Sequence, residues 1–471
     1  MSVRQLLTIE SVVILCYFLF VNGVYVIMLI SAAVELRRNA QLTRFEQRWR
    51  VLGSTAAPSI SVLAPAYGEE ATIVASTRAL LALNYPSLEV IVIVDGSPDA
   101  TLQRLIDAFT MFETPTVHRR RIDAQAVRGM YRSIEFPTLV VVDKENGGKA
   151  DALNVGLNVS SAELVCAIDA DTIIEPDALQ RMVRPFLFED RVVAAGGTIR
   201  VANGSTIRGG RVLLARAPRR PIAGFQAVEY LRAFLIGRLG WNRLGGNLII
   251  SGAFGLFRSD AVMDAGGYEH DTVGEDMELV ARLRIRGREL GRHDRIAFVP
   301  DPVAWTEVPE GLRTLGRQRD RWHRGLADTL WRHRRVLFRP RFGALGLVVL
   351  PSFLLIELLA PVVEAIGVLT LLVALPLDLV DPRFASLFLL VAYALGAALS
   401  ILTLMLEELR FHRYDERGDR LLMMLWALLE NFGYRQLTVV WRLRGLWGWL
   451  RGRKEWGAMQ RTGFSEPAEP V

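Results

Sequence analysis

Two long stretches without a charged residue constrain this chain more than any other feature. Ser11–Val34 holds 24 consecutive uncharged residues, and Phe384–Leu406 holds 23. Each is long enough for a helix that crosses the hydrocarbon core of a bilayer, which needs about 20 apolar residues. The first is longer than the core of a cleaved signal peptide, which has about 7–15 residues, so we expect a retained anchor. The sequence therefore predicts an integral membrane protein.

Arginines beside these stretches predict which side of the membrane each flank occupies. Arg37 and Arg38 follow the first stretch, and Arg410 and Arg413 follow the second. Because positively charged loops stay on the cytoplasmic side, we expect both flanks and the domain between them to be cytoplasmic. Anionic lipid headgroups are the expected partners of this charge. The chain has a net charge of +6, but its sequence shows no module of interleaved aromatic and basic residues. This argues against nucleic-acid binding.

The C-terminal apolar region leaves its number of membrane spans open. Phe342–Leu377 is interrupted by Glu357, Pro361 and Glu364, so it forms either one tilted or kinked helix or an interfacial piece followed by a span. Leu421–Leu429 is short, and we expect it to be interfacial or re-entrant. The predicted organisation is an N-terminal transmembrane anchor, a cytoplasmic α/β domain, C-terminal transmembrane or interfacial helices and a cytoplasmic tail, at residues 1–36, 55–330, 331–445 and 446–471.

Between the spans, apolar strand patterns alternate with helix patterns. This alternation predicts an α/β, Rossmann-like fold with a mainly parallel sheet and right-handed crossovers. Residues 112–136 and 203–224 are rich in arginine, and we expect them to be connections. The strands are predicted at residues 59–65, 88–94, 138–142 and 164–168, with helices after each of the first three.

The strand predicted at 164–168 ends in two carboxylates, Asp169 and Asp171. Residues two apart on extended chain point to the same side, so both carboxylates could converge on one cation. A hard divalent ion such as Mg²⁺ or Mn²⁺ favours oxygen ligands. Ligands of open α/β sheets also bind beyond the carboxyl ends of strands. An Asp-x-Asp pair alone is common in surface turns, so the other motifs decide its meaning.

Several short motifs follow one another along the chain. They are Ala64-Pro65-Ala66-Tyr67-Gly68-Glu69, Val94-Asp95-Gly96-Ser97, Gly148-Lys149-Ala150-Asp151-Ala152-Leu153-Asn154, Asp169-Ala170-Asp171, Gly274-Glu275-Asp276 and Gln318-Arg319-Asp320-Arg321-Trp322. In this order they resemble family 2 glycosyltransferases, and most closely the processive membrane-embedded branch that includes cellulose, hyaluronan and poly-N-acetylglucosamine synthases. The resemblance covers about residues 55–330 and implies a nucleotide-sugar transferase (GT-A) domain, a UDP-sugar donor, a growing polysaccharide acceptor and a bacterial inner-membrane location.

The first three motifs are expected to bind the nucleotide end of the donor. Asp95 could accept hydrogen bonds from uracil or ribose, or it could only cap a turn. The family often has two adjacent acids here, whereas this chain has Val94 before Asp95. Tyr67 could stack near the base and Glu69 could hold the nucleotide, or both could only shape their loop. Lys149 can approach phosphate as a compact point charge, or it could face solvent.

The acidic motifs resemble the family's catalytic groups. Asp169 resembles the acid near the donor diphosphate and sugar, and Asp171 resembles the metal ligand. The metal would offset charge that grows on the departing diphosphate. Asp276 resembles the base that takes the proton of the acceptor hydroxyl. The alternative is that Glu275 and Asp276 only occupy the first turn of a helix, where its dipole favours acids.

Gln318, Arg321 and Trp322 lie on a basic amphipathic segment before the C-terminal apolar block. Arg321 can pair with pyrophosphate through its planar fork, and Trp322 can stack on a sugar ring of the acceptor. The alternative for an Arg-Trp pair beside a membrane is an interface anchor. In the resembled family this motif accompanies processive polymerisation.

The combined prediction is a processive, inverting, metal-dependent transferase that builds a β-linked polysaccharide from UDP-glucose or UDP-N-acetylglucosamine and moves it across the membrane. One alternative is a non-processive, lipid-directed family 2 glycosyltransferase. Another is a non-catalytic transport or scaffold subunit with a degenerate nucleotide-binding domain. Export or accessory subunits are further expected partners, and the sequence does not select the sugar or its linkage.

Overall fold

The computed structural model describes residues 3–49, 57–116, 120–169, 172–208, 210–414 and 416–453. The chain divides into two compact units. The sheet unit comprises Leu36–Arg216 and Asn247–Glu307. The helical unit comprises Met1–Glu35, Ala217–Gly246 and Val308–Gly457.

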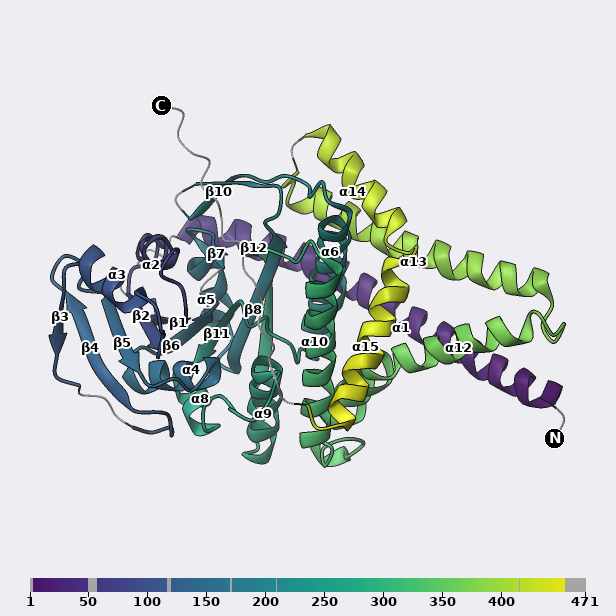
Figure 1. Cartoon of the computed structure of the whole chain (residues 1–471), viewed down its shortest axis with the longest axis horizontal. Helices are drawn as coiled ribbons and strands as arrows, with labels where there is room; N and C mark the ends of the chain where they lie inside the picture. Colours follow the sequence, from purple (N-terminus) through teal and green to yellow (C-terminus); the bar gives the residue numbers. More distant parts are fainter. Residues whose placement is uncertain are drawn as a thin grey trace. The chain divides into compact units, whose positions relative to one another are not determined.

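The described residues of the sheet unit form a ten-stranded sheet and a separate two-stranded hairpin (Figure 1). The hairpin consists of β9 (Thr206–Arg208) and β10 (Arg211–Leu214). In spatial order the large sheet contains β3 (Met111–Thr114), β4 (Val127–Ser133), β5 (Leu139–Lys144), β2 (Leu88–Asp95), β1 (Ile60–Ala66), β6 (Leu164–Ile168), β11 (Phe254–Arg258), β8 (Val192–Val201), β12 (Arg295–Thr306) and β7 (Ile173–Ile174).

The centre of the large sheet is parallel, as the sequence predicts. β5, β2, β1 and β6 are neighbours that run in the same direction. Their carboxyl ends therefore lie at one edge of the sheet, where ligands of such folds bind. β3 and β4 add antiparallel strands beside β5, and β11 inserts antiparallel between β6 and β8.

The arginine-rich segments predicted as connections contain strands instead. Residues 112–136 include most of β3 and all of β4, and residues 203–224 include the β9–β10 hairpin. β3, β9 and β10 are short, and in all four strands most side chains are at least partly exposed. They therefore lack the buried apolar run by which the central strands are recognised.

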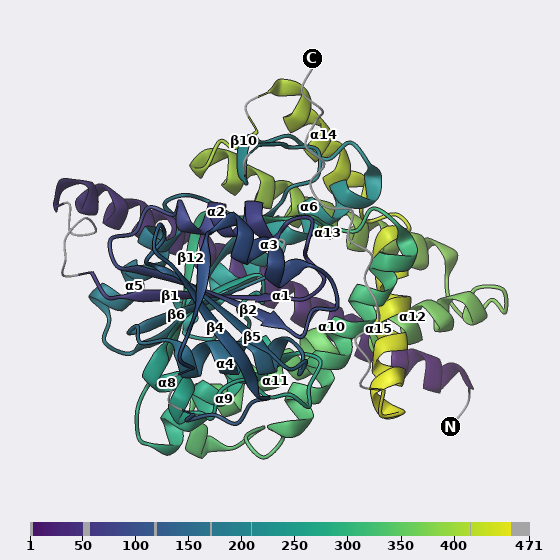
Figure 2. The same cartoon turned by 60° about the vertical axis from the view of Figure 1, so that its left-hand side comes forward.

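Helices cover both faces of the sheet (Figure 2). On one face, buried apolar side chains of α4 and α9 belong to the same hydrophobic core as Leu63 of β1 and Ile93 of β2. α2, α3 and α5 lie on the opposite face. The bounds are α2 (Ile73–Leu81), α3 (Thr101–Ala108), α4 (Lys149–Val159), α5 (Ala178–Phe188), α8 (Ser259–Asp264) and α9 (Glu275–Glu289).

Three described helices are long and apolar enough to cross a membrane: Ile9–Gln41, Leu345–Ala374 and Pro382–Arg410. The first belongs to α1 (Val3–Trp49), and the last is α13. Leu345–Ala374 is a helix with two π-helical turns around Pro351 and ends in α12 (Ala360–Ala374). Since proline removes a backbone donor from a helix, this supports the kinked-helix alternative.

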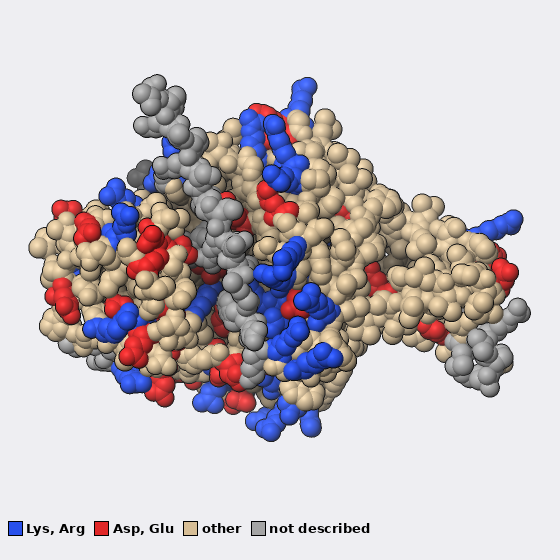
Figure 3. Space-filling model, in the orientation of Figure 1, with Lys and Arg blue, Asp and Glu red and all other residues tan. Residues whose placement is uncertain are grey.

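Several further helices complete the helical unit. Figure 3 shows Lys and Arg side chains gathered over α10 and α15, whereas α12 and α13 carry few charges. α14 has 13 residues and is not among the described helices that could span a membrane. The bounds are α6 (Pro221–Arg232), η2 (Ala233–Arg238), α7 (Leu239–Leu244), α10 (Leu312–Arg332), η3 (Pro340–Phe342), η4 (Leu345–Val349), α11 (Leu350–Ser352), η5 (Phe353–Leu358), α14 (Arg417–Leu429) and α15 (Tyr434–Leu450).

The division of the chain differs from the predicted boundary at residue 330. α6 and α10 belong to the helical unit, although both fall within the predicted α/β domain of residues 55–330. The reason is packing against later helices: Trp426 Nε1 donates a hydrogen bond of 2.9 Å to the Pro218 carbonyl, and Arg232 pairs with the buried Glu430. The Gln318–Trp322 motif on α10 is therefore part of the helical unit.

Candidate active site

The loop after β1 carries two predicted nucleotide ligands in different environments. The side chain of Tyr67 is 57% exposed, so its ring is open to a partner. The Glu69 carboxylate accepts a hydrogen bond of 2.7 Å from the Thr72 hydroxyl at the start of α2. The Glu69 amide donates to the Thr101 hydroxyl at 3.0 Å, which ties this loop to the start of α3. Glu69 thus shapes the loop in this structure.

Asp95, at the end of β2, is buried, and its carboxylate is already engaged. It pairs with the Lys144 ammonium and accepts hydrogen bonds from the amides of Gly147 at 3.0 Å and Gly148 at 2.8 Å. These contacts hold the loop that leads into Lys149. The structure therefore places Asp95 beneath the predicted nucleotide-binding loop, with its oxygens bound to that loop.

Lys144 is a buried cation that sequence reasoning missed. Its side chain is 0% exposed, and its Nζ lies 2.7 Å from Asp151 Oδ1 in addition to pairing with Asp95. Lys144 and Asp95 are cross-strand neighbours in the β2–β5 register. The Asp151 carboxylate also accepts the Gln125 amide hydrogen bond at 3.1 Å. One ammonium thus joins two carboxylates beneath the loop 145–148.

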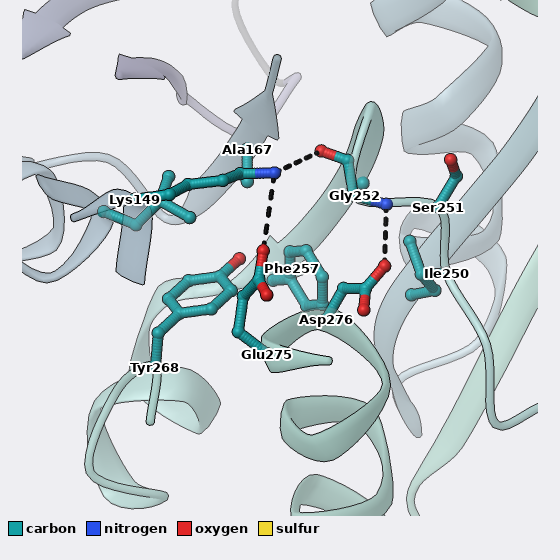
Figure 4. Close-up of a pocket in the computed structure, with 11 residues that line it drawn as sticks. Lys149, Ala167, Ile250, Ser251, Gly252, Phe257, Tyr268, Glu275 and Asp276 are labelled. Carbon is teal, nitrogen blue, oxygen red and sulfur yellow. Dashed lines mark hydrogen bonds and ion pairs between the residues drawn. The ribbon is translucent and has the colours of Figure 1, made fainter. Parts of the chain in front are cut away.

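Lys149, the first residue of α4, is the centre of the site (Figure 4). Its Nζ lies 2.6 Å from Asp169 Oδ1, 3.2 Å from the Gly252 carbonyl oxygen and 3.6 Å from Glu275 Oε1. Burial lowers the pKa of Lys149, but the nearby carboxylates outweigh burial and hold it above its ordinary value. The side chain is therefore a fixed positive charge at the strand ends.

Glu275 and Asp276 form the first turn of α9, as the helix-start alternative expects. Asp276 Oδ2 accepts a hydrogen bond of 3.0 Å from the Gly252 amide. Glu275 is buried, and burial raises its pKa, with Lys149 acting in the opposite direction and Asp276 in the same one. Glu275 and Asp276 are therefore adjacent acids in different environments. Both lie at a helix N-terminus, where the helix dipole favours negative charge.

Gly252 allows these groups to approach its backbone. A Cβ atom at this position would lie 3.2 Å from both Asp276 Oδ2 and Lys149 Nζ. Any side chain would therefore displace the two charged groups that use this backbone. The pocket in Figure 4 is lined by Lys149, Leu153, Ala167, Ile250, Ser251, Gly252, Gly255, Phe257, Tyr268, Glu275 and Asp276.

The predicted metal site is only partly described. Asp169 follows β6 with its side chain 32% exposed, and its carboxylate is a donor that suits Mg²⁺ or Mn²⁺. Asp171, the predicted metal ligand, lies outside the described residues. Within the ranges that the structure describes, no three His, Cys, Asp or Glu side chains converge as a metal site.

Gln318, Arg321 and Trp322 lie together on α10 of the helical unit. Gln318 and Arg321 are partly buried, whereas Trp322 is 42% exposed. The structure thus brings Lys149, Asp169, Glu275 and Asp276 together in one unit and places the Gln318–Trp322 motif in the other.

The fold and the site define the class of protein. The family described as "Glycosyltransferase like family 2" matches residues 57–325, more than half of the chain, and the chain belongs to this family. Its sheet unit is a nucleotide-sugar transferase domain of the GT-A type. A mannosyltransferase from Pyrobaculum calidifontis, solved with GDP-Man and Mn²⁺, shares this fold, with a TM-score of 0.53 and 18% identity over 91% of this chain and 99% of that one.

Curated relatives are more similar in sequence. Poly-β-1,6-N-acetyl-D-glucosamine synthase from Staphylococcus aureus strain COL is 32% identical over 276 residues, which are 58% of this chain and 56% of the relative. The synthase of the same name from Staphylococcus epidermidis is 31% identical over 275 residues, again 58% and 56% of the two chains. The chain thus spans about half the length of the curated relatives it matches.

Proposed function

We propose that this chain is a processive, inverting glycosyltransferase that builds a β-linked polysaccharide from a UDP-sugar. The observation that carries the proposal is the convergence of Lys149, Asp169, Glu275 and Asp276 around the Gly252 backbone at the carboxyl ends of the parallel strands. The names of the relatives favour UDP-N-acetylglucosamine over UDP-glucose.

In the proposed reaction, Asp276 acts as the general base. As it takes the proton of the acceptor hydroxyl, the hydroxyl oxygen forms a bond to the anomeric carbon of the donor sugar. The bond from that carbon to the diphosphate breaks, and the electron pair leaves on the diphosphate. Attack from the opposite face inverts the anomeric centre. The Gly252 amide holds Asp276 Oδ2 in place, so little reorganisation accompanies proton transfer.

Lys149 and Asp169 serve the donor side of the proposed reaction. The Lys149 ammonium stabilises the negative charge that develops on the leaving diphosphate. A divalent cation would be held by Asp171, with Asp169 beside it; when bound, it would act as a Lewis acid toward the diphosphate. Tyr67 offers an exposed ring to the base. Asp95 supports the phosphate-binding loop through its hydrogen bonds to Gly147 and Gly148 rather than by reading the base.

The helical unit serves the acceptor and the membrane in this proposal. Gln318, Arg321 and Trp322 take the roles that the family motif implies: Arg321 pairs with pyrophosphate through its planar fork, and Trp322 stacks on a sugar ring of the acceptor. The three candidate spans carry the product outward. The arginines that follow the uncharged stretches of α1 and α13 favour a cytoplasmic catalytic domain in a bacterial inner membrane, with anionic lipids as partners.

The test is to incubate membranes that contain the full chain with separate radiolabelled UDP-sugars and to digest the product with linkage-specific hydrolases. We expect a long polymer from UDP-N-acetylglucosamine, and Asp276→Asn should lower its formation at least about 100-fold while donor binding persists. If the product is instead a lipid that carries a single sugar, the chain is a lipid-directed glycosyltransferase and the proposal of polymerisation is wrong. Absence of UDP release from every donor would favour the scaffold alternative.

A further inference from the structure

Three helices of the helical unit meet at one carboxylate, Glu229 of α6. Its Oε2 accepts a hydrogen bond of 2.9 Å from Arg319 Nη2 on α10 and another of 2.6 Å from the Tyr434 hydroxyl on α15. Arg319 is buried, and Glu229 is partly buried. Because hydrogen bonds to charged groups are strong and directional, Glu229 fixes the plane of the Arg319 guanidinium.

The fixed guanidinium lies against an exposed indole ring. The Arg319 Cζ atom is 4.5 Å from the centroid of the Trp322 ring, which is three residues further along the same helix. A guanidinium over the face of tryptophan at this distance is a favourable cation–π contact. Since Glu229 limits the movement of Arg319, it also restricts the rotamers of Trp322.

A second contact holds the Trp322 ring from the neighbouring helix. Tyr230 follows Glu229 on α6, and its ring centroid lies 6.4 Å from that of Trp322 with an angle of 37° between the planes. Trp322 nevertheless keeps 42% of its surface exposed. The ring is thus held by Arg319 and Tyr230 and still offers apolar surface to a ligand. This is the arrangement that a stacking platform for a sugar ring requires.

We propose that Glu229 and Arg319 are positioning residues that fix the Trp322 ring for the acceptor sugar. This inference rests on the proposed function, in which Trp322 contacts the acceptor. A fixed ring loses less side-chain entropy when the sugar binds, and this preorganisation strengthens binding. Neither Glu229 nor Arg319 touches the acceptor in this arrangement.

The first test compares Glu229→Gln and Arg319→Lys with the wild-type protein. Lysine keeps the charge at position 319 but loses the planar group that covers Trp322. For both variants we expect the KM for a short β-1,6-linked N-acetylglucosamine oligomer to rise about 5-fold, with the donor KM and kcat nearly unchanged, because acceptor binding alone is weakened. The control is Asp328→Asn, which breaks an ion pair of 2.8 Å with Arg332 on the same helix and should leave both KM values unchanged.

A second measurement keeps this inference separate from the proposed function. The difference in fluorescence between wild type and Trp322→Phe isolates Trp322 among the ten tryptophans of the chain, and binding of the oligomer should quench that component. In Glu229→Gln, the Kd of the oligomer measured from this quenching should rise by about the same factor as the acceptor KM. If wild type transfers no sugar but the quenching follows this pattern, only the catalytic proposal fails. Unaltered acceptor binding in both variants, or an equal rise of donor and acceptor KM, would overturn the positioning role.

Discussion

The least expected residue in this chain is Lys144, whose side chain is completely buried. Removal of an ammonium from water is costly, and only well-placed opposite charges offset that cost. Asp95 and Asp151 supply two carboxylates, and Asp95 also binds the amides of Gly147 and Gly148. The network therefore fixes the loop before Lys149, and this arrangement requires the burial of the Lys144 charge.

We expect Lys144→Met to destabilise the protein strongly. The substitution leaves two buried carboxylates without their cation, which typically costs about 3–5 kcal/mol and should lower the apparent thermal midpoint by roughly 10 °C. The matched control is Arg128→Met, because Arg128 pairs with Asp143 at 2.6 Å but is half exposed; this loss should cost at most about 1 kcal/mol. Thermal scans of the full chain in detergent, followed by tryptophan fluorescence, measure both. Equal shifts for the two variants would contradict the role of the buried network.

At this scale, the sequence can indicate where a residue lies in the fold when its neighbours in the chain determine that position. Lys149, Asp169 and Asp276 follow strand ends or begin helices, and the structure brings them together as the motif order implies. The Lys144–Asp151 pair has no such local signal, because it depends on how β5 and α4 pack. The sequence leaves open whether Asp95 binds the nucleotide or caps a turn, and its hydrogen bonds to the loop before Lys149 could not be inferred from β2 alone.

At the scale of elements, the candidate active site forms where the loop 251–253 contacts the first turn of α9. The amide and the carbonyl of Gly252 contact Asp276 and Lys149 respectively. One glycine backbone therefore couples the proposed base to the proposed phosphate-binding cation. The coupling depends on the missing side chain rather than on an unusual backbone angle.

Gly252→Ala should reduce activity with little change in stability. A Cβ atom would lie 3.2 Å from Asp276 Oδ2 and Lys149 Nζ, and both side-chain ends can move to relieve the contact. Because that relief displaces the reacting groups, we expect kcat to fall at least about 10-fold, while the thermal midpoint changes by less than about 3 °C. Gly311→Ala is the control, since a Cβ atom there meets nothing within 4 Å. Full activity in Gly252→Ala would show that the close approach is dispensable.

The elements that the sequence predicts correctly are those with continuous apolar runs. β1, β2, β5 and β6 are buried over most of their length, and each contains such a run, at residues 62–66, 90–94, 139–142 and 164–168 respectively. The boundary at residue 330 differs because α10 is basic and amphipathic like the surface helix of a soluble domain. Its partner, α15, lies more than a hundred residues away in sequence, and no local pattern reports that pairing.

At the scale of the whole molecule, a catalytic sheet unit and a helical unit with candidate spans occur in one chain. The helical unit also carries the Gln318–Trp322 motif, so the proposed acceptor site and the apolar helices form one structural body. This organisation suits an enzyme that keeps its product bound between additions. A lipid-directed enzyme that transfers a single sugar has no need to retain its product.

We therefore expect processive elongation when acceptor is in large excess over enzyme and donor is limiting. An enzyme that retains its chain converts a few acceptors into long products and leaves most unextended, because dissociation is slower than the next addition. Gel separation of products from a labelled N-acetylglucosamine oligomer, at several ratios of enzyme to acceptor, measures the length distribution. The upper limit of product length should not depend on the ratio of enzyme to acceptor. Lengths that rise by one sugar at a time in all acceptors would instead indicate release after every transfer, and the helical unit would then serve as an anchor rather than as a holder of the growing chain.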